Sequence, residues 1–452
     1  MNIIIVGCGK VGSTILSSLL AEGHDIVVID PNPDVISEVS NIYDSMYVCG
    51  NGVDSDTLSE AGVEQTELFV AVTGSDELNM LSCFIAKRMG AKHTIARIRN
   101  PEYNDKSLEF MRQQLDLSSS INPDLLAAQE LYHVLKLPSA VKIEYFSHRR
   151  FEMVELVLKP DSPFCGASLM ELRKKYEAKF LICAVQRGDN VYIPDGRFEM
   201  QAGDRIELTA APAEIQKLLR MLGLSQKQSK NVMILGASRM GYYLARMLMA
   251  SGTTVKLIDK DRQRCQEISE KLPNATVICG DGAQQELLLE EGLRSMDAFI
   301  SLTGMDEENI LISFYASSQG VQKVVAKVNR EELRPIAEKL GLESLVSPRE
   351  TSSNVLSRYA RSLQNSLGCN VETLYKIMDG KVEALEFRVH EDFIQTNVPL
   401  KDMRLKPGVL ITGILRGRKP LIPAGDDVIL PGDRVVVVAA GLQPRDLSDI
   451  LE

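Results

Sequence analysis

Short apolar runs rich in β-branched residues alternate with helical patterns in the first part of the chain. Strands that are buried on both faces of a parallel sheet show such near-continuous apolar runs. Between two of the runs, Val11, Ile15, Leu16 and Leu19 recur at helical spacing and would share one helix face. The pattern predicts βαβ units and a doubly wound parallel α/β sheet. The expected strands are 3–6, 26–29, 46–48, 68–72, 94–98 and 117–121.

The same pattern occurs twice in the chain. The segment 6–12 recurs at 235–241, so that Gly7 corresponds to Gly236, 229 residues further on. Many landmarks agree in the same order, which chance does not explain, and the chain is therefore a tandem duplication. Further matches at offsets of 229 or 230 pair 28–30 with 257–259, 49–52 with 279–282, 72–77 with 302–307 and 96–98 with 326–328.

A different kind of sequence follows in each half. Short strand candidates at 180–186, 190–194 and 205–210 are separated by Gly and Pro, which is typical of a small α+β module. Gly203-Asp204-Arg205 recurs as Gly432-Asp433-Arg434. The polar stretch 225–230 is the expected linker between the halves. The expected domains are a nucleotide-binding sheet at 1–123, a small module at 141–224, a second sheet at 231–348 and a second module at 370–452.

Composition narrows the class of protein. The 452 residues carry 51 Lys and Arg against 61 Asp and Glu, and a net charge of −10 argues against nucleic acid as the main partner. No apolar run approaches the roughly 18 residues of a membrane span. The first residues lack the basic start of a signal peptide, so we expect a cytoplasmic protein.

Catalytic and metal-binding patterns are missing from the sequence. The eight cysteines form no Cys-x-x-Cys pair, and Cys49, Cys183 and Cys279 lie in apolar runs, which predicts reduced core residues. The five histidines show no metal-binding spacing, and we find neither a P-loop nor a Gly-x-Ser-x-Gly elbow. We therefore predict no catalytic residue and no metal site.

The segment Gly7-x-Gly9-x-x-Gly12 has the context of a dinucleotide-binding turn. A strand precedes it, a helix follows it, and Asp30 ends the next strand 18 residues after Gly12. Gly7 would permit the tight turn, Gly9 the approach of a pyrophosphate, and Gly12 the packing of helix on strand. Asp30 would bind ribose hydroxyls and repel a 2′-phosphate, which favours NAD(H) or an adenine nucleotide over NADP. The alternative is a helix cap without a ligand.

The second copy of this turn is altered. Ser238 replaces the middle glycine, and its side chain would either crowd a pyrophosphate or donate a hydrogen bond to it. Asp259 is retained, and Arg239 follows the serine at a position suited to phosphate. Two interpretations stay open, a second nucleotide site and a degenerate structural repeat.

Other candidates lie at the ends of later strands. Thr73-Gly74 and Thr303-Gly304 end the fourth strand of each copy, at the edge where such sheets bind ligands, although a turn that starts the next helix is an alternative. Arg97 and Lys327 are cations within apolar runs, which is costly unless each is paired with an acid or a phosphate. A buried ion pair and a ligand contact are both consistent with this pattern.

These residues resemble a known family. The order GCGKVG (7–12), VVID (27–30), CGNG (49–52), AVTGSDELN (71–79) and ARIRNPEY (96–103), followed by AGDRIEL (202–208), is similar to the RCK (regulator of potassium conductance) fold. The tandem arrangement resembles the TrkA family, the cytoplasmic regulatory subunits of Trk-type potassium uptake systems. The resemblance covers nearly the whole chain and implies two Rossmann-like sheets, each followed by a small module that dimerises or senses a ligand.

The resemblance also implies a function and a set of contacts. A member of this family would bind NAD(H) and ATP or ADP and form a homo-oligomeric, tetrameric ring. The ring would attach to a transmembrane potassium transporter or channel at the inner face of the membrane. Asn51 departs from the residue that related chains often carry. The candidate cofactor-binding residues are Gly7, Cys8, Gly9, Lys10, Val11, Gly12, Asp30, Asn51, Thr73, Gly74, Arg97, Gly236, Ser238, Arg239, Met240, Asp259, Asp281, Thr303 and Lys327.

Two helical patterns, at 123–135 and 348–363, follow the last strands of the two sheets. In the family that the chain resembles, such helices cross to a neighbouring lobe, whereas an ordinary helix would cover its own sheet. Both arrangements fit the apolar pattern.

Two other functions share the glycine turn. A soluble NAD-dependent oxidoreductase would need an acid or base beside the nicotinamide, and the small modules show no obvious candidate. An assembly scaffold with a vestigial site would bind no nucleotide.

Overall fold

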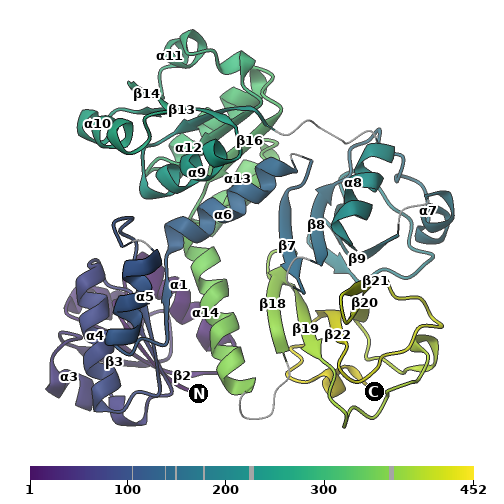
Figure 1. Ribbon diagram of the computed structural model, residues 1–452, viewed down its shortest axis with the longest axis horizontal. Coiled ribbons are helices and arrows are strands. Elements are labelled where there is room, and N and C mark those ends of the chain that lie inside the picture. Colours follow the sequence, from purple (N-terminus) through teal and green to yellow (C-terminus); the bar gives the residue numbers. More distant parts are fainter. Residues whose placement is uncertain (104, 138, 148–149, 177–178, 223–228, 366–370) are drawn as a thin grey trace. The chain divides into compact units, whose positions relative to one another are not determined.

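The computed structural model describes residues 1–103, 105–137, 139–147, 150–176, 179–222, 229–365 and 371–452. The chain forms two compact units, and each unit combines the corresponding parts of both sequence halves. One unit contains Met1–Tyr132 and Lys230–Ala360, and the other contains His133–Ser229 and Arg361–Glu452 (Figure 1). Most of the predicted linker, 225–228, lies outside the described residues.

The first lobe of the first unit is a six-stranded parallel sheet with the strand order β3-β2-β1-β4-β5-β6. Its order reverses between β1 and β4, which is the topological switch point where such sheets bind ligands. The predicted strands are confirmed to within one or two residues. They are β1 Asn2–Val6, β2 Asp25–Asp30, β3 Met46–Cys49, β4 Leu68–Ala71, β5 His93–Arg97 and β6 Ser119–Ile121, with helices α1 Lys10–Ala21, α2 Pro33–Ser40, α3 Ser55–Glu60, α4 Asp76–Met89, α5 Asp105–Gln114 and α6 Pro123–Lys136.

The second lobe repeats this topology with the order β14-β13-β12-β15-β16-β17. Both sheets are wholly parallel, and the predicted pair of Rossmann-like sheets is confirmed. The strands are β12 Asn231–Leu235, β13 Thr254–Asp259, β14 Thr276–Cys279, β15 Ala298–Ser301, β16 Lys323–Lys327 and β17 Ser344–Val346, and the helices are α9 Arg239–Ala250, α10 Arg262–Lys271, α11 Gln285–Glu290, α12 Asp306–Ser318, α13 Arg334–Lys339 and α14 Pro348–Asn365.

The helices that follow the last strands make contacts across the two lobes. In α14, the Ser357 hydroxyl lies 3.1 Å from that of Ser18 in α1 of the first lobe, and the Ser353 hydroxyl donates to the Thr14 carbonyl at 3.5 Å. Asn122, just before α6, donates to the hydroxyl of Tyr243 in α9 at 3.0 Å. Of the two arrangements that the sequence left open, the structure shows the exchange of helices between lobes (Figure 1).

The second unit contains two antiparallel five-stranded modules with the orders β10-β9-β11-β8-β7 and β18-β19-β22-β20-β21. The two modules share an apolar core that includes Phe146, Phe151, Val382 and Val436. The small α+β modules are confirmed. Their elements are β7 Lys142–Phe146, β8 Phe151–Val157, α7 Leu169–Lys175, β9 Phe180–Arg187, β10 Asn190–Tyr192, β11 Arg205–Ala210, α8 Pro212–Met221, β18 Val371–Ile377, β19 Val382–Arg388, β20 Val409–Arg416, β21 Lys419–Leu421 and β22 Arg434–Ala440.

One expectation about the cysteines is wrong. Cys183 is buried as expected, but Cys49 and Cys279 are exposed free thiols. They end β3 and β14, which are the edge strands of their sheets, so these positions lack the cover that a central strand has on both sides. Apolar sequence neighbours alone do not distinguish an edge strand from a central one.

A buried ion pair recurs in the two modules. Asp204 is fully buried, accepts from Arg187 Nε at 2.7 Å and Nη2 at 2.8 Å, and also accepts from the Gln201 amide at 2.8 Å. Asp433 accepts in the same way from Arg416 and from the Leu430 amide. The repeated Gly-Asp-Arg sequence therefore marks the turn that precedes the last strand of each module.

We expect Asp204→Ala to lower the stability of the protein by about 2 kcal/mol, because it leaves the Gln201 amide without its buried acceptor and removes the partner of Arg187. Chemical denaturation followed by circular dichroism measures this loss. Asp189→Ala, at an exposed position of the same module, is the control. Equal stability of the two variants would contradict a structural role for the pair.

Candidate functional site

The glycine turn of the first lobe lies between β1 and α1, at the switch point of the sheet. Gly7 has a φ of +93°, and a Cβ at this residue would lie 2.9 Å from the Thr73 amide nitrogen. A Cβ on Gly12 would lie 2.0 Å from the Gly7 carbonyl oxygen. These two glycines are therefore required by the protein's own backbone. A Cβ on Gly9, in contrast, would meet no atom of the described residues within 4 Å, so the space above Gly9 is open to a ligand.

The start of α1 offers backbone donors to an anion. Gly9 is the N-cap of this helix, and within the described residues no side chain caps it. The first amides of a helix have no intrahelical acceptor, and the helix dipole favours a negative charge beside them. The open space above Gly9 and these amides together form a cradle of the kind that holds a pyrophosphate, and this geometry fits a dinucleotide.

Asp30 holds the glycine turn in place. Its carboxylate is almost buried and accepts from the Cys8 amide at 2.8 Å and from the Asn32 amide at 2.9 Å. Asp259 in the second lobe accepts from the Ala237 amide at 2.6 Å and the Asp261 amide at 2.9 Å. Each carboxylate oxygen can accept a further hydrogen bond, so Asp30 retains capacity for a ribose hydroxyl.

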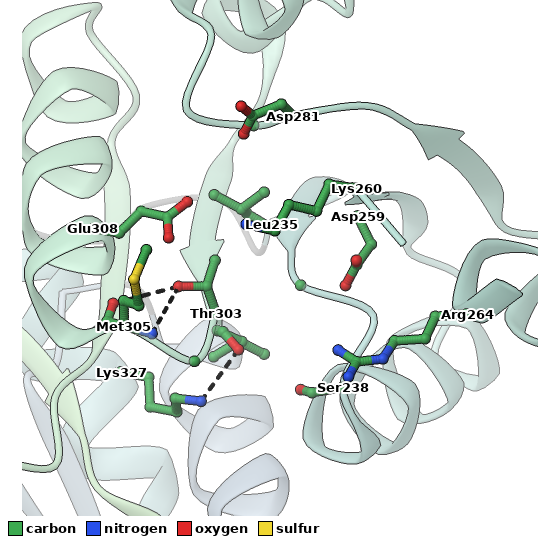
Figure 2. A pocket seen from close by; sticks show the side chains of 14 residues that line it. Leu235, Ser238, Asp259, Lys260, Arg264, Asp281, Thr303, Met305, Glu308 and Lys327 are labelled. Carbon is green, nitrogen blue, oxygen red and sulfur yellow. Dashed lines mark hydrogen bonds between the residues drawn. The ribbon is translucent and has the colours of Figure 1, made fainter. Parts of the chain in front are cut away.

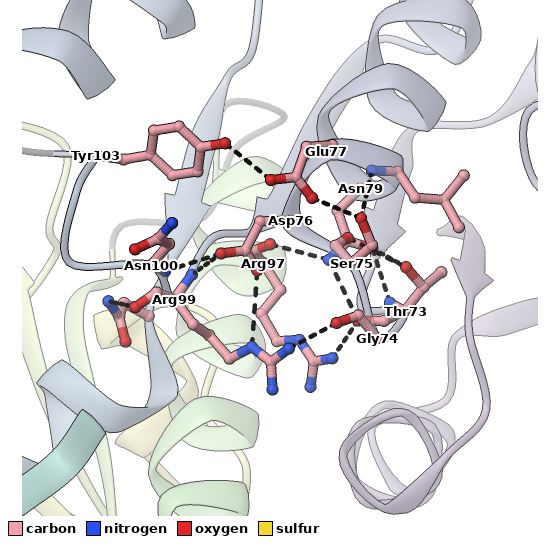
Figure 3. Close-up of polar contacts among 12 residues, drawn as sticks. Thr73, Gly74, Ser75, Asp76, Glu77, Asn79, Arg97, Arg99, Asn100 and Tyr103 are labelled. Carbon is pink, nitrogen blue, oxygen red and sulfur yellow. Dashed lines mark hydrogen bonds and ion pairs between the residues drawn. The ribbon is translucent and has the colours of Figure 1, made fainter. Parts of the chain in front are cut away.

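The turn between β4 and α4 is held by side chains that the sequence analysis did not single out (Figure 3). Asn79 is fully buried and accepts from both the amide and the hydroxyl of Thr73 at 2.7 Å, while its own amide donates to the Arg97 carbonyl at 2.9 Å. The Asp76 carboxylate accepts from the amides of Arg99 and Asn100 at 2.8 Å. The duplication in the sequence could have identified both residues, because they recur 230 positions later as Asp306 and Asn309. The structure shows equivalent contacts for the second pair.

Arg97 places a cation at the end of β5, beside the glycine turn. Its side chain is 6% exposed and donates to the carbonyl of Thr73, whose amide lies against Gly7. Burial, and after it the charge of Arg99, lowers the pKa of Arg97 to about 10, so it remains charged at neutral pH. Among the described residues, its Nε has no hydrogen-bond partner, and no carboxylate lies within ion-pair distance. The charges of Asp76 and Asp124 nevertheless favour the Arg97 cation without a direct ion pair in the described residues.

The second lobe contains a cavity of about 330 Å³ at the equivalent place (Figure 2). The Ser238 hydroxyl accepts from the Gly241 amide at 3.3 Å and so caps α9. Lys327 donates to the Leu302 carbonyl at 3.2 Å, and burial lowers its pKa. The predicted residues that line the cavity are Gly236, Ser238, Asp259, Asp281, Thr303 and Lys327.

Some predicted residues can contribute only through their backbone. The side chains of Cys8 and Met240 are buried in the protein, at 3% and 1% exposure. Lys10, Asn51 and Arg239 are exposed, and Val11 is partly exposed. Sequence reasoning also missed Lys260, Arg264, Met305 and Glu308, all of which line the cavity of the second lobe.

Substitution by alanine should have different effects at Gly9, which faces open space, and at Gly12, which packs against the backbone. We expect Gly9→Ala to change stability by less than about 1 kcal/mol but to weaken nucleotide binding in the first lobe at least about tenfold, because its Cβ enters the space that Gly9 leaves open. Gly12→Ala should lower stability by about 1–3 kcal/mol, because its Cβ overlaps the Gly7 carbonyl. Thermal unfolding and calorimetry with NADH measure both effects. A Gly9→Ala variant that binds NADH normally would show that the open space is not the ligand cradle.

We expect Arg97→Met to raise the stability of the unliganded protein by about 1 kcal/mol, because burial disfavours this charge more than Asp76 and Asp124 favour it. The same change should weaken nucleotide binding at least about tenfold, which corresponds to one lost phosphate contact. Lys92→Met, at an exposed position just before β5, is the control for the loss of one positive charge. A destabilised variant with unchanged binding would assign Arg97 a purely structural role.

The chain matches two protein-family models twice each. The TrkA-N domain matches residues 3–115 and 232–348, and the TrkA-C domain matches residues 153–223 and 385–441. The match of each model in both halves confirms the duplication.

Curated relatives align along the full length. A protein of Archaeoglobus fulgidus named Trk system potassium uptake protein TrkA homolog is 33% identical over 450 residues and covers 100% of both chains. Trk system potassium uptake protein TrkA of Vibrio alginolyticus is 31% identical over 443 residues, which is 97% of this chain and 95% of that protein. Among solved structures, the GsuK channel bound to NAD superposes on 97% of this chain and 77% of its own, with a TM-score of 0.63 at 18% identity. The chain therefore belongs to the TrkA family.

Proposed function

We propose that this protein is a regulatory subunit that binds NAD(H) and adenine nucleotides in its lobes and gates a Trk-type potassium transporter or channel. The observation that carries the proposal is the open cradle above Gly9 next to the buried cation of Arg97, whose charged form burial disfavours. A buried cation costs stability unless an anion compensates it, and the phosphates of a nucleotide would supply that anion.

The choice of nucleotide rests on Asp30. Its carboxylate has capacity for ribose hydroxyls and would repel a phosphate on the same ribose. The GsuK channel, which has the same fold, is described as bound to NAD. When bound, the nucleotide supplies negative charge and binding energy, and the residues of the chain orient it. Gly7, Gly9, Lys10, Val11, Gly12, Thr73 and Gly74 would surround its phosphates in the first lobe.

The proposed partner is a membrane protein. In the parts of the chain that the structure covers, no helix has both the length and the apolar character that a bilayer span requires. Relatives along the full length are named as potassium uptake proteins. We propose that the protein is cytoplasmic and attaches to the inner face of the membrane through a Trk-type transporter.

The proposed assembly is a ring of identical chains, of which a tetramer is the expected form. Leu81 in α4 and Leu311 in α12 are equivalent positions of the two lobes and are 49% and 63% exposed. Phe314, one turn after Leu311, is 43% exposed. Apolar side chains that repeat at equivalent exposed positions suit contacts between copies of the chain.

A nucleotide gates the partner only if it binds one ring conformation better than another. Shifting a gate from about 1:99 to 99:1 takes roughly 5.5 kcal/mol of differential binding. Four equivalent sites would each need to contribute only about 1.4 kcal/mol, which is a tenfold preference. A ring that repeats the Arg97 contact in each copy therefore suits the task.

The test is potassium flux through the reconstituted Trk partner with and without nucleotide. We expect Gly9→Ala and Asp30→Ala to weaken the nucleotide response, because the first narrows the cradle of the first lobe and the second removes its ribose acceptor. Asp25→Ala, exposed at the opposite end of β2, should respond as the unmodified protein does. An unaltered response in both site variants would refute the proposal.

A further inference from the structure

The segment that follows the ribose-binding aspartate differs in charge between the two lobes. Residues 30–35 read Asp-Pro-Asn-Pro-Asp-Val and carry a formal charge of −2. The equivalent residues 259–264 read Asp-Lys-Asp-Arg-Gln-Arg and carry +1. The two lobes therefore have the same fold but opposite charge at the side of the site where an adenosine ribose would lie.

The backbones of the two segments are equivalent, so the side chains can be compared position by position. Each aspartate ends the second strand of its sheet and accepts from the amide two residues further on, Asn32 in one lobe and Asp261 in the other. Lys260 and Arg264 consequently occupy the positions of Pro31 and Val35. Segment 30–35 of the first lobe contains no Lys or Arg, so only the second lobe has positive side chains at these positions.

Both added cations belong to the cavity of the second lobe. Lys260 and Arg264 line it together with Asp259, and Figure 2 shows the Arg264 guanidinium directed toward Ser238 and Asp259. The Arg264 Nε lies 3.5 Å from Asp261 Oδ2, and both side chains are about half exposed. An exposed ion pair of this kind is worth roughly 0–1 kcal/mol, so a phosphate can replace it at little cost.

The chemistry of the ribose explains what these cations select. An aspartate at the end of the second strand favours free ribose hydroxyls, whereas a nearby arginine accommodates a 2′-phosphate. Asp259 accepts from the same two backbone amides as Asp30, so the difference between the lobes rests on the added cations and not on the aspartates. Arginine binds phosphate through paired hydrogen bonds, and lysine adds a point charge.

We propose that the second lobe selects a nucleotide that carries a phosphate on its adenosine ribose, of the NADP(H) class, while the first lobe selects the unphosphorylated form. This inference rests on the proposed nucleotide-binding function and extends it. One chain would then respond to two different cofactor pools through two sites of the same fold.

The experiment is titration calorimetry of the full chain with adenosine 2′,5′-bisphosphate and with 5′-AMP, repeated with NADPH and NADH. The Asp30→Ala background, which removes the ribose acceptor of the first lobe only, isolates the second lobe. There we expect the 2′-phosphate to improve affinity at least roughly tenfold, and Arg264→Gln or Lys260→Gln to remove most of that gain. Arg264→Lys should retain part of it, because the charge remains. Arg262→Gln is the matched control, because it removes one positive charge from the same segment outside the cavity lining.

Two results would overturn the inference. An equal loss of affinity for the bisphosphate and for 5′-AMP in Arg264→Gln would show that the guanidinium stacks on the adenine instead. Absence of any preference for the 2′-phosphate in the second lobe would overturn it directly, while normal NADH binding by the first lobe would leave the proposed function intact. Failure of the unmodified chain to bind NADH would instead refute the proposed function.

Discussion

The close approach of the α1 backbone to the turn after β1 is the constraint on which the site depends. A Cβ at Gly12 would overlap the Gly7 carbonyl, and a Cβ at Gly7 would press on the Thr73 amide. The second lobe keeps the same contacts at Gly236 and Gly241. Only the middle position is free of the protein's own atoms, which explains why it alone changes from Gly9 to Ser238. The serine then acts as the cap of α9, a role that the glycine cannot fill.

A second constraint fixes the opposite wall of the site. Asn79 and Asn309 join the turn after the fourth strand to the end of the fifth, and each lies fully buried. These bonds hold Arg97 and Lys327 at the same edge of their sheets, in an environment that disfavours the charged form. Arg97 is buried and Lys327 is half-buried, and in both lobes burial disfavours the charge of the side chain. Under the proposed function, the phosphates of a nucleotide would stabilise both charges.

The sequence predicted the individual strands and helices better than it predicted which strands become neighbours and which domains pack together. The apolar runs and the helical spacing were sufficient for the strands of both parallel sheets, because local pattern determines local structure. The strands β7 and β8 of the small module were missed, and the exposure of Cys49 and Cys279 was wrong, because both depend on which strands become neighbours. The two parallel-sheet lobes form one unit and the two small modules form the other. This association likewise depends on contacts between residues far apart in the sequence. Asp76 and Asn79, however, were visible as residues that recur in the duplicated segments, and only their role needed the structure.

The contacts between the lobes connect their two sites. The Tyr243 hydroxyl, in the second turn of α9, donates to the Arg99 carbonyl at 3.1 Å, two residues beyond Arg97. Asp124 at the start of α6 lies in the field of Arg97 and Arg99 from the first lobe and of Arg239 and Lys327 from the second. Burial raises the pKa of Asp124, and these four cations act to lower it. A phosphate that compensates the cations of one lobe therefore changes the electrostatic balance at the other. If both lobes bind nucleotide as proposed, this coupling is reciprocal, and each ligand would change the affinity of the other by the same factor.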